Sequence, residues 1–266
     1  RTSARVVIRE ANTISRASKD AANLRQRYMP RIMRVCYRWA DRIVAVSQGV
    51  RDDLVLTTGL PGKRVRVIYN PISALEILAR SETDPDHPWF APNQPPVVLG
   101  VGRLCSQKDF STLIRAFALA QRRIPGRLII LGEGEERESL EALIAELGLR
   151  EDASMPGLVE NPYQYMARCA VFALSSRYEG LPNALIEAMV CGAGVISTDC
   201  ESGPREILDG GKYGALTPVG DCESLGAGIM DLIESPPPAD LSRRGGMRFE
   251  QDGILEQYMS ILLGDD

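Results

Sequence analysis

Short apolar runs alternate with amphipathic segments along most of this chain. The runs ARVVIRE, PPVVLGVGRL, GRLIILGEG and CAVFALSS are rich in β-branched residues and are bounded by polar residues or glycine, as expected of buried strands. Segments such as DFSTLIRAFALAQRRI, between two of these runs, carry apolar residues at helical spacing. Alternation of this kind implies parallel strands joined by right-handed crossovers. We therefore predict an α/β fold with a doubly wound parallel sheet, in which ligands bind at the carboxyl ends of the strands.

A proline-rich stretch at 76–96 interrupts the alternation. Its segment SETDPDHPWFAPNQPP contains five prolines and has no hydrophobic periodicity, which is the composition of a linker. We predict a first unit over 1–75, a larger unit over 97–246 and a C-terminal helix within 247–266. Because the chain begins without Met, inside what has the pattern of an ongoing fold, we expect it to be a fragment of a longer protein.

The composition argues against several kinds of site. No apolar run approaches the roughly 18 residues that a transmembrane helix needs. The six cysteines form no CxxC pair and no metal-ligand spacing, and His87 is the only histidine. We therefore expect no zinc site, no histidine-based triad and, since no acidic cluster has metal-ligand spacing, no bound metal.

Charge is distributed unevenly between the two halves of the chain. Residues 1–72 contain 15 basic and 5 acidic residues, a net charge of +10, whereas the rest contains 16 and 30, a net charge of −14. Opposite signs suggest two units that face different partners. A helix is predicted over 30–42, with Pro30 in its first turn. Arginines at spacings of three and four are expected on one face and apolar residues on the other: Arg27, Arg31, Arg34, Arg38 and Arg42 against Ile32, Val35, Cys36 and Trp39.

The predicted arginine face suggests a partner for the first unit. We expect it to attract anionic lipid headgroups at a membrane surface. The alternatives are a solvated helix face and a face packed against another segment. Nucleic acid would be drawn to the same charge, but no recognition module accompanies it, so no nucleic-acid partner is expected.

The segment SSRYEGLPNALIEAM, at 175–189, places two glutamates eight positions apart around a turn. A strand leads into this turn, and Pro182 or Asn183 begins a helix that ends near Gly192. Free backbone N–H groups at the start of a helix attract phosphate, and a glycine there has no Cβ to hold an anion away. The residues expected to form this phosphate pocket are Gly180, Leu181, Asn183 and Ala184.

The two glutamates flank the expected phosphate pocket. Glu187, just over one turn into the helix, is placed to accept hydrogen bonds from a ribose diol. Glu179, before the turn, would be repelled by phosphates and is expected to bind the neutral hydroxyls of a sugar. The glutamate spacing alone favours a simpler interpretation, a capped core helix with two surface glutamates.

Four segments in order support the first interpretation, because together they resemble a known family. Over about 97–262 the chain is similar to the donor domain of a retaining glycosyltransferase of the GT-B type, family 4, which has a doubly wound, Rossmann-like sheet. The segments RIVAVSQGVRDDL and VRVIYNPI resemble the end of that family's acceptor domain, so 1–75 is expected to be a partial acceptor domain. The last helix is then expected to fold back toward it. The four segments are VGRLCSQKDFSTLIRAF, LIILGEGEERESLEALIAELGL, SSRYEGLPNALIEAMVCGAGVISTD and SGPREILDGGKYGALTPVGD.

The resemblance implies a role for several residues. Arg103 and Lys108 match the arginine and lysine that hold the donor diphosphate in that family, and they would do so without a metal. Glu179 would orient the donor sugar. Many members carry a histidine near the reacting sugar, which has no counterpart here; Arg9, Glu10 or Asn12 is expected to face that space. The further donor-binding residues implied are Gly102, Gly132, Gly134, Leu158, Pro182, Ser202 and Gly203.

The resemblance also implies an activity. We expect a cytoplasmic glycosyltransferase, peripheral on the inner face of the plasma membrane, that moves a sugar from a nucleotide-diphosphate donor such as a UDP-sugar to a glycolipid or polysaccharide. Two alternatives remain open. One is a sugar-nucleotide epimerase or hydrolase of the same architecture, and the other is a non-catalytic nucleotide-sugar-binding domain.

Overall fold

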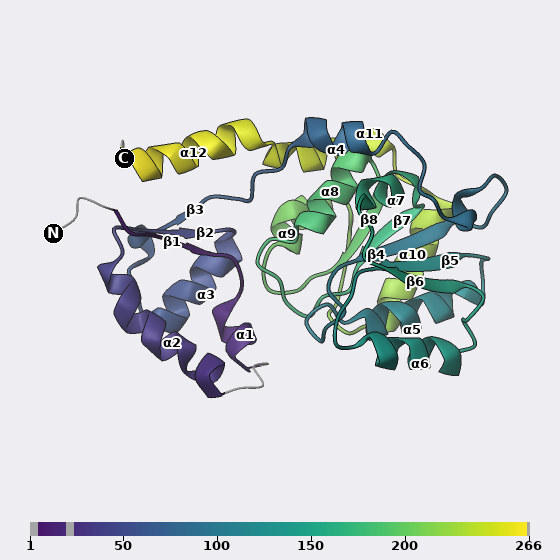
Figure 1. Ribbon diagram of the computed structural model, residues 1–266, viewed down its shortest axis with the longest axis horizontal. Helices are drawn as coiled ribbons and strands as arrows, with labels where there is room; N and C mark the ends of the chain where they lie inside the picture. The colour runs from purple at the N-terminus through teal and green to yellow at the C-terminus, as the bar shows by residue number, and fades with distance from the viewer. Residues whose placement is uncertain (1–4, 20–23, 265–266) are drawn as a thin grey trace.

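Two α/β units of unequal size lie side by side in the computed structural model, which describes residues 5–19 and 24–264 (Figure 1). Each unit contains its own sheet, and the paired strands of both sheets are parallel. The smaller unit is N-terminal, and the C-terminal helix returns to it. The α/β fold predicted from the alternation is confirmed.

The N-terminal unit is built on three strands. Its elements are β1 (Val7–Glu10), α1 (Ile14–Lys19), α2 (Leu24–Cys36), β2 (Arg42–Ala45), α3 (Gln48–Thr58) and β3 (Val65–Val67). The strand order is β1-β2-β3, and the core between sheet and helix includes the buried side chains of Ile43 and Leu54. α3 begins after Ser47, whose hydroxyl accepts a hydrogen bond from the N–H of Val50, and ends at Gly59 in the left-handed conformation.

The arginine-rich helix differs from its prediction. α2 contains Pro30 in its interior and ends at Cys36. Arg38 therefore lies in a separate 3-10 turn and Arg42 is the first residue of β2, so the prediction of one face with five arginines is wrong. The side chain of Arg27 lies outside the described part of the structure.

A tertiary contact holds the turn that follows this helix. The guanidinium of Arg64, just before β3, donates hydrogen bonds to the carbonyls of Arg38 and Ala40. These bonds fix the backbone in the turn that leads into β2. Arg64 is 26 residues from Arg38 along the chain, so the sequence pattern of α2 could not predict this contact.

The apolar side expected for this helix is not buried either. Ile32, Val35 and Trp39 are 49%, 55% and 75% exposed, whereas Met33 is buried. α2 therefore packs through Met33 rather than through the residues opposite the arginines. No helix in the described ranges is long and apolar enough to span a bilayer.

The larger unit contains a six-stranded sheet that is doubly wound. Its strands are β4 (Val97–Val101), β5 (Arg127–Leu131), β6 (Ala153–Gly157), β7 (Val171–Leu174), β8 (Gly194–Thr198) and β9 (Ala215–Thr217). They are arranged in the order β6-β5-β4-β7-β8-β9. The direction of winding reverses between β4 and β7, which creates a crevice at their carboxyl ends. The predicted sheet is confirmed.

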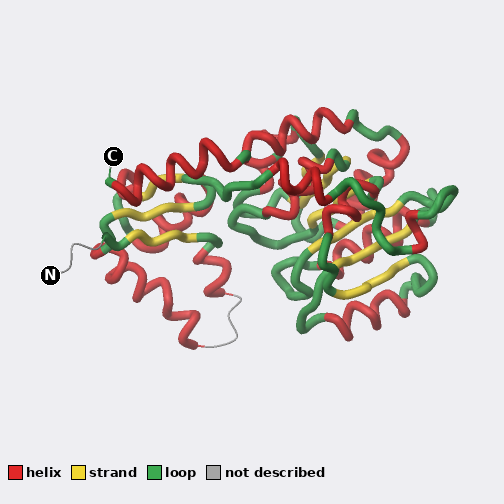
Figure 2. The backbone as a smooth tube through the Cα atoms, turned by 45° about the horizontal axis from the view of Figure 1, so that its top comes forward, coloured by secondary structure: helices red, strands yellow, loops and turns green. Residues whose placement is uncertain are grey.

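Helices cover both faces of this sheet (Figure 2). They are α5 (Phe110–Gln121), α6 (Arg137–Glu146), α7 (Pro162–Arg168), α8 (Asn183–Cys191), α9 (Pro204–Ile207), α10 (Cys222–Glu234) and α11 (Ala239–Gly246). Buried residues of α5, α6 and α10 form one core with the sheet. Those of α7 and α8 belong to a second core, which continues without a break into the N-terminal unit.

The predicted linker and the last helix both have regular structure. The predicted linker at 76–96 contains most of α4 (Ala74–Arg80) and a 3-10 turn, Pro88–Phe90. The last helix, α12 (Gln251–Leu263), runs beside the N-terminal unit (Figure 1). Its Tyr258 hydroxyl accepts a hydrogen bond of 3.0 Å from the side chain of Arg9 in β1.

Candidate functional site

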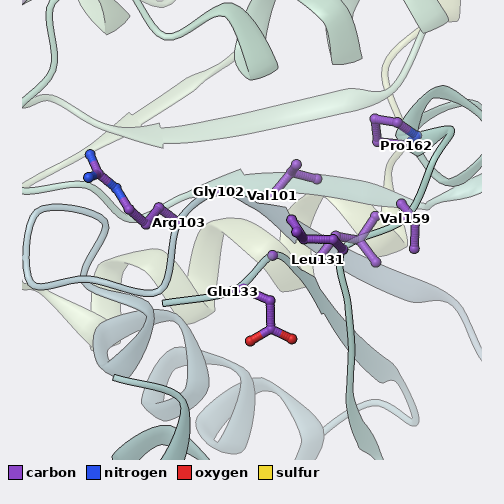
Figure 3. A pocket seen from close by; sticks show the side chains of 9 residues that line it. Val101, Gly102, Arg103, Leu131, Glu133, Val159 and Pro162 are labelled. Carbon is purple, nitrogen blue, oxygen red and sulfur yellow. The ribbon is translucent and has the colours of Figure 1, made fainter. Parts of the chain in front are cut away.

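A pocket of about 430 Å³ opens at the carboxyl ends of β4 and β5 (Figure 3). Sites for small molecules have volumes of roughly 300–1,000 Å³, so the pocket is large enough for part of a nucleotide. It is lined by Val101, Gly102, Arg103, Leu131, Gly132, Glu133, Leu158, Val159 and Pro162. Four residues predicted for the donor site, Gly102, Arg103, Gly132 and Leu158, therefore meet at one pocket.

Two glycines bring the loops around this pocket together. Gly132 has φ +141°, and a Cβ there would collide with the carbonyl of Gly102. A Cβ at Gly134 would collide with the carbonyl of Leu104. The room left by the missing side chains is thus occupied by backbone of the loop after β4 and is not open to a ligand.

The charged side chains at the pocket differ in their pairing. Arg103 is exposed and extends away from Val159 and Pro162 in Figure 3; within the described residues its guanidinium has no ion-pair partner. Glu133 instead accepts hydrogen bonds of 2.7 and 2.6 Å from Arg137. These bonds lower the pKa of Glu133. Arg103 is therefore the available cation at this edge.

A buried ion pair crosses the switch point between β4 and β7. The ammonium of Lys108 lies 2.6 Å from Oε1 of Glu179, and the side chains are only 18% and 7% exposed. The hydroxyl of Ser176 also donates a 2.6 Å hydrogen bond to Oε1. The sequence placed Lys108 at a diphosphate and Glu179 at a sugar, whereas the structure pairs them with each other. Oε2 of Glu179 has no partner among the described residues.

The turn between β7 and α8 presents unused backbone donors. α8 begins at Asn183 and ends at Cys191, directly before Gly192, as predicted. In the part of the chain that the structure describes, the N–H groups of Gly180, Leu181, Asn183 and Ala184 donate no hydrogen bond. Together with the positive end of the α8 dipole, they can receive an anion.

The sequence suggested that Gly180 leaves room for an anion, but in the structure it leaves room for another part of the backbone. A Cβ at this position would collide with the carbonyl of Ala11, in the loop after β1. The space is therefore taken by the N-terminal unit rather than by an anion, and Gly180 permits a close approach between the two units.

Glu187 is a partly buried carboxylate without a hydrogen-bond partner among the described residues. Burial raises its pKa above the ordinary value. The pKa of Tyr163, which is next to the pocket-lining Pro162, is raised mainly by burial and further by the negative charge of Glu187. A desolvated carboxylate with free acceptor sites can bind a pair of hydroxyl groups.

The loop before α9 packs directly on the turn before α8. Gly203 has φ +91°, and a Cβ there would lie 2.6 Å from Pro182 and 2.9 Å from the carbonyl of Gly180. The buried hydroxyl of Ser202 has no hydrogen-bond partner within the described residues. Of these two residues predicted for the donor site, Gly203 thus lies against the turn and Ser202 against Gly49 of α3, and neither lines the pocket of Figure 3.

Several residues of the N-terminal unit contact the same turn, and the sequence did not predict them. The hydroxyl of Thr13 donates to the carbonyl of Glu179 at 3.4 Å. The side-chain amide of Asn70 donates to the side chain of Asn183 at 2.6 Å. Asn70 lies three residues beyond the end of β3, so its place shortly after a strand was the only signal in the sequence.

The three residues considered for the missing histidine have other contacts. Arg9 donates hydrogen bonds to Asn70 and to Tyr258. The carboxylate of Glu10 accepts a 3.0 Å hydrogen bond from Tyr37, although burial still raises the pKa of Glu10. The side chain of Asn12 accepts from the N–H of Thr13. Arg9 is linked to the turn through Asn70, and the backbone of Asn12 lies against Gly180 of the same turn.

Taken together, the two parallel α/β units, with a pocket and an anion-accepting turn at the edge where they meet, define a protein of the GT-B class. The model of the family "Glycosyl transferases group 1" matches residues 83–246, and that of "Glycosyltransferase Family 4" matches residues 7–74. The chain belongs to this glycosyltransferase family.

Curated relatives are longer than this chain. The N-acetylgalactosamine-N,N'-diacetylbacillosaminyl-diphospho-undecaprenol 4-alpha-N-acetylgalactosaminyltransferase of Campylobacter jejuni is 35% identical over 203 residues, which is 76% of this chain and 53% of the relative. The lipopolysaccharide 1,6-galactosyltransferase of Salmonella typhimurium is 28% identical over 85% of this chain and 60% of its own length. The chain thus spans only a little over half of each relative.

A solved structure has the same fold over nearly the whole chain. HepE of Anabaena, in complex with UDP and glucose, superposes with a TM-score of 0.82 over 97% of this chain and 71% of its own. Its sequence is 23% identical, so the likeness concerns the fold alone.

Proposed function

We propose that this chain is the catalytic part of a retaining glycosyltransferase that moves a sugar from a nucleoside-diphosphate sugar to a glycolipid or polysaccharide. The observation that carries the proposal is the set of unused N–H groups at the start of α8. Two further groups support it: Arg103 at the neighbouring strand end and Glu187 within α8, neither of which has an ion-pair or hydrogen-bond partner among the described residues. An anion receptor flanked by a cation and a diol acceptor fits a nucleoside diphosphate.

The proposed reaction needs charge stabilisation at the leaving group. As the bond between the anomeric carbon and the β-phosphate oxygen breaks, charge develops on that phosphate, where Arg103 and the α8 N–H groups lower the barrier. The acceptor oxygen bonds to the anomeric carbon on the same face, and its proton passes to the leaving phosphate. Glu179, held by Lys108 and Ser176, orients the sugar through Oε2 and is not the nucleophile.

Relatives supply the classes of donor and acceptor for this proposal. HepE is complexed with UDP and glucose, and the Campylobacter enzyme is named for a diphospho-undecaprenol acceptor. These proteins support our proposal of a UDP-sugar donor and a lipid-linked or saccharide acceptor for this chain. We propose that the reaction proceeds without a metal, since Arg103 and backbone dipoles supply the positive charge.

Replacing Glu187 with glutamine tests the proposed diol contact. Since a charge-assisted hydrogen bond is lost, Glu187→Gln should weaken a UDP-sugar and bare UDP alike, by about tenfold or more. The variant should also be more stable at pH 7, because burial raises the Glu187 pKa. A carboxylate whose pKa is raised in the folded state destabilises the fold at pH values above that raised pKa, where it is charged. The destabilisation vanishes below the ordinary pKa of 4.5, where the group is protonated in both the folded and the unfolded state. The gain should therefore disappear at acid pH.

Calorimetry and thermal melting at two pH values measure both effects. Glu138→Gln, an exposed glutamate on α6, is the matched control and should change neither. Glu179→Ala should leave UDP binding nearly intact while abolishing most turnover. Equal affinities for UDP in the Glu187→Gln variant and the unaltered protein would contradict the nucleotide site, and binding without any transfer would favour a non-catalytic domain.

We further propose a cytoplasmic location at an anionic membrane surface. The charge of +10 over 1–72 and the exposed Ile32, Val35 and Trp39 beside Arg31 support it, although five arginines do not share one face. The chain should float with vesicles of phosphatidylglycerol and phosphatidylcholine, and be released by salt. Equal flotation with phosphatidylcholine alone would contradict this proposal.

A further inference from the structure

A carboxylate of the larger unit caps a helix of the N-terminal unit. Glu206, in α9, accepts hydrogen bonds of 3.0 Å from the backbone N–H groups of Gln48 and Gly49, one on each carboxylate oxygen. The hydroxyl of Tyr69, after β3, donates to the same group at 3.3 Å. Three donors of one unit thus converge on a single side chain of the other.

The first turn of α3 depends on this contact. A helix leaves its first N–H groups without partners inside the helix. Ser47 serves the N–H of Val50 from within the N-terminal unit, whereas Gln48 and Gly49 are served from across the boundary. The negative charge also lies at the positive end of the α3 dipole, where it is stabilised. If the units separated, these groups would have only water.

The other polar contacts between the units are weaker anchors. Arg16 and Glu201 form an ion pair at 2.9 Å, but their side chains are 46% and 61% exposed, so solvent screens it. Asn70 and Asn183 form a hydrogen bond between neutral groups. Glu206 is half-buried and makes two charge-assisted bonds, which are stronger than neutral ones.

A short path joins this contact to the turn before α8. α9 contains only Pro204–Ile207, so Glu206 is three residues from Gly203, which packs against Gly180 and Pro182. A Cβ at Gly49 would lie 2.5 Å from the Cβ of Ser202, so α3 itself rests on this loop. The start of α3 and the anion-accepting turn therefore contact the same few residues.

We propose that Glu206 is a positioning residue: by capping α3 across the boundary it holds the two units in the closed arrangement and sets the turn before α8 for reaction. This role in turnover rests on the proposed function. Glutamine at 206 offers one acceptor where two are needed, and its amide group opposes the second donor. Glu206→Gln should therefore favour separation of the units.

Hydrogen exchange on the full chain tests the contact without any substrate. In Glu206→Gln the amides of Gln48 and Gly49 should exchange about tenfold faster or more, as expected for the loss of a charge-assisted bond, and small-angle scattering should show a larger radius of gyration. Glu206→Asp keeps the charge, so its exchange rates and radius of gyration should lie between those of Glu206→Gln and the unaltered protein. Asp221→Asn is the matched control, because Asp221 caps α10 within one unit and should leave the amides of α3 unchanged.

Turnover supplies the second measurement. kcat should fall about tenfold in Glu206→Gln and recover in part in Glu206→Asp, while UDP affinity is largely retained. Tyr69→Phe removes one donor to Glu206 and keeps the ring, so it should also speed the exchange of the Gln48 and Gly49 amides. It replaces Glu206→Gln as the test if that variant fails to fold. Unchanged exchange at Gln48 and Gly49, or equal opening in Asp221→Asn, would overturn the proposal. Opening as expected in a chain that transfers no sugar would refute the proposed function and leave the contact between the units established.

Discussion

Lys108→Met should destabilise the protein by about 3–5 kcal/mol, because it leaves a buried carboxylate without its counter-charge. Glu179 is 7% exposed at its side chain, and Lys108 is its only cationic partner within the described residues. The Ser176 hydroxyl would remain, but a neutral donor compensates a buried charge only in part. Chemical denaturation at neutral pH, with the midpoint and slope compared to the unaltered protein, measures the loss.

Two further variants identify the cause of this loss. The double change Lys108→Met with Glu179→Leu should be more stable than Lys108→Met alone, since it removes the unpaired charge as well. Lys212→Met breaks an exposed pair with Asp209 and should change stability little. If Lys108→Met were as mild as Lys212→Met, the buried pair would contribute no more than a surface contact.

Arg103→Ala should lower kcat by about a hundred- to a thousandfold, the usual cost of losing one group that stabilises developing charge. Arg103 is exposed and has no ion-pair partner among the described residues, so its removal leaves no buried charge behind. Stability should accordingly stay unchanged while turnover falls. A steady-state transfer assay with saturating donor, combined with a thermal melt, separates the two effects.

Arg122→Ala provides the control for Arg103, because Arg122 is also exposed but lies at the far end of α5. It should keep full activity. EDTA should matter little if Arg103 and the α8 N–H groups neutralise the diphosphate. Activity that EDTA abolishes and Mg²⁺ or Mn²⁺ restores would refute the metal-free mechanism, and a fall in kcat of only a few-fold would remove Arg103 from it.

The regular elements of the larger unit could be predicted from the sequence because their signals are local. Buried strands such as β7 are continuous apolar runs. For α8, Pro182 predicts the start of the helix and Gly192 predicts its end. The parallel, doubly wound order then follows from strand–helix alternation. The edge of the sheet where the pocket lies was predictable for the same reason.

The partners of individual site residues were not predictable in the same way. The sequence assigned Lys108 and Glu179 to a ligand, and only the fold shows that they lie across the switch point and bind each other. Gly180 reads as room for an anion, yet the carbonyl of Ala11 fills that room. Charge and size are properties of one residue, whereas what occupies the neighbouring space depends on chain from elsewhere.

The sequence by itself therefore determined the α/β class, the doubly wound sheet and the edge that carries the candidate site, since each depends on patterns within a few tens of residues. Tertiary structure alone decided how the turn after α2 is held, because Arg64 binds the carbonyls of Arg38 and Ala40. It also decided that Glu206 caps α3, although Gln48 precedes Glu206 by 158 residues. The first contact forms only when the N-terminal unit folds and the second only when the two units pack together, so no local pattern in the sequence predicts either.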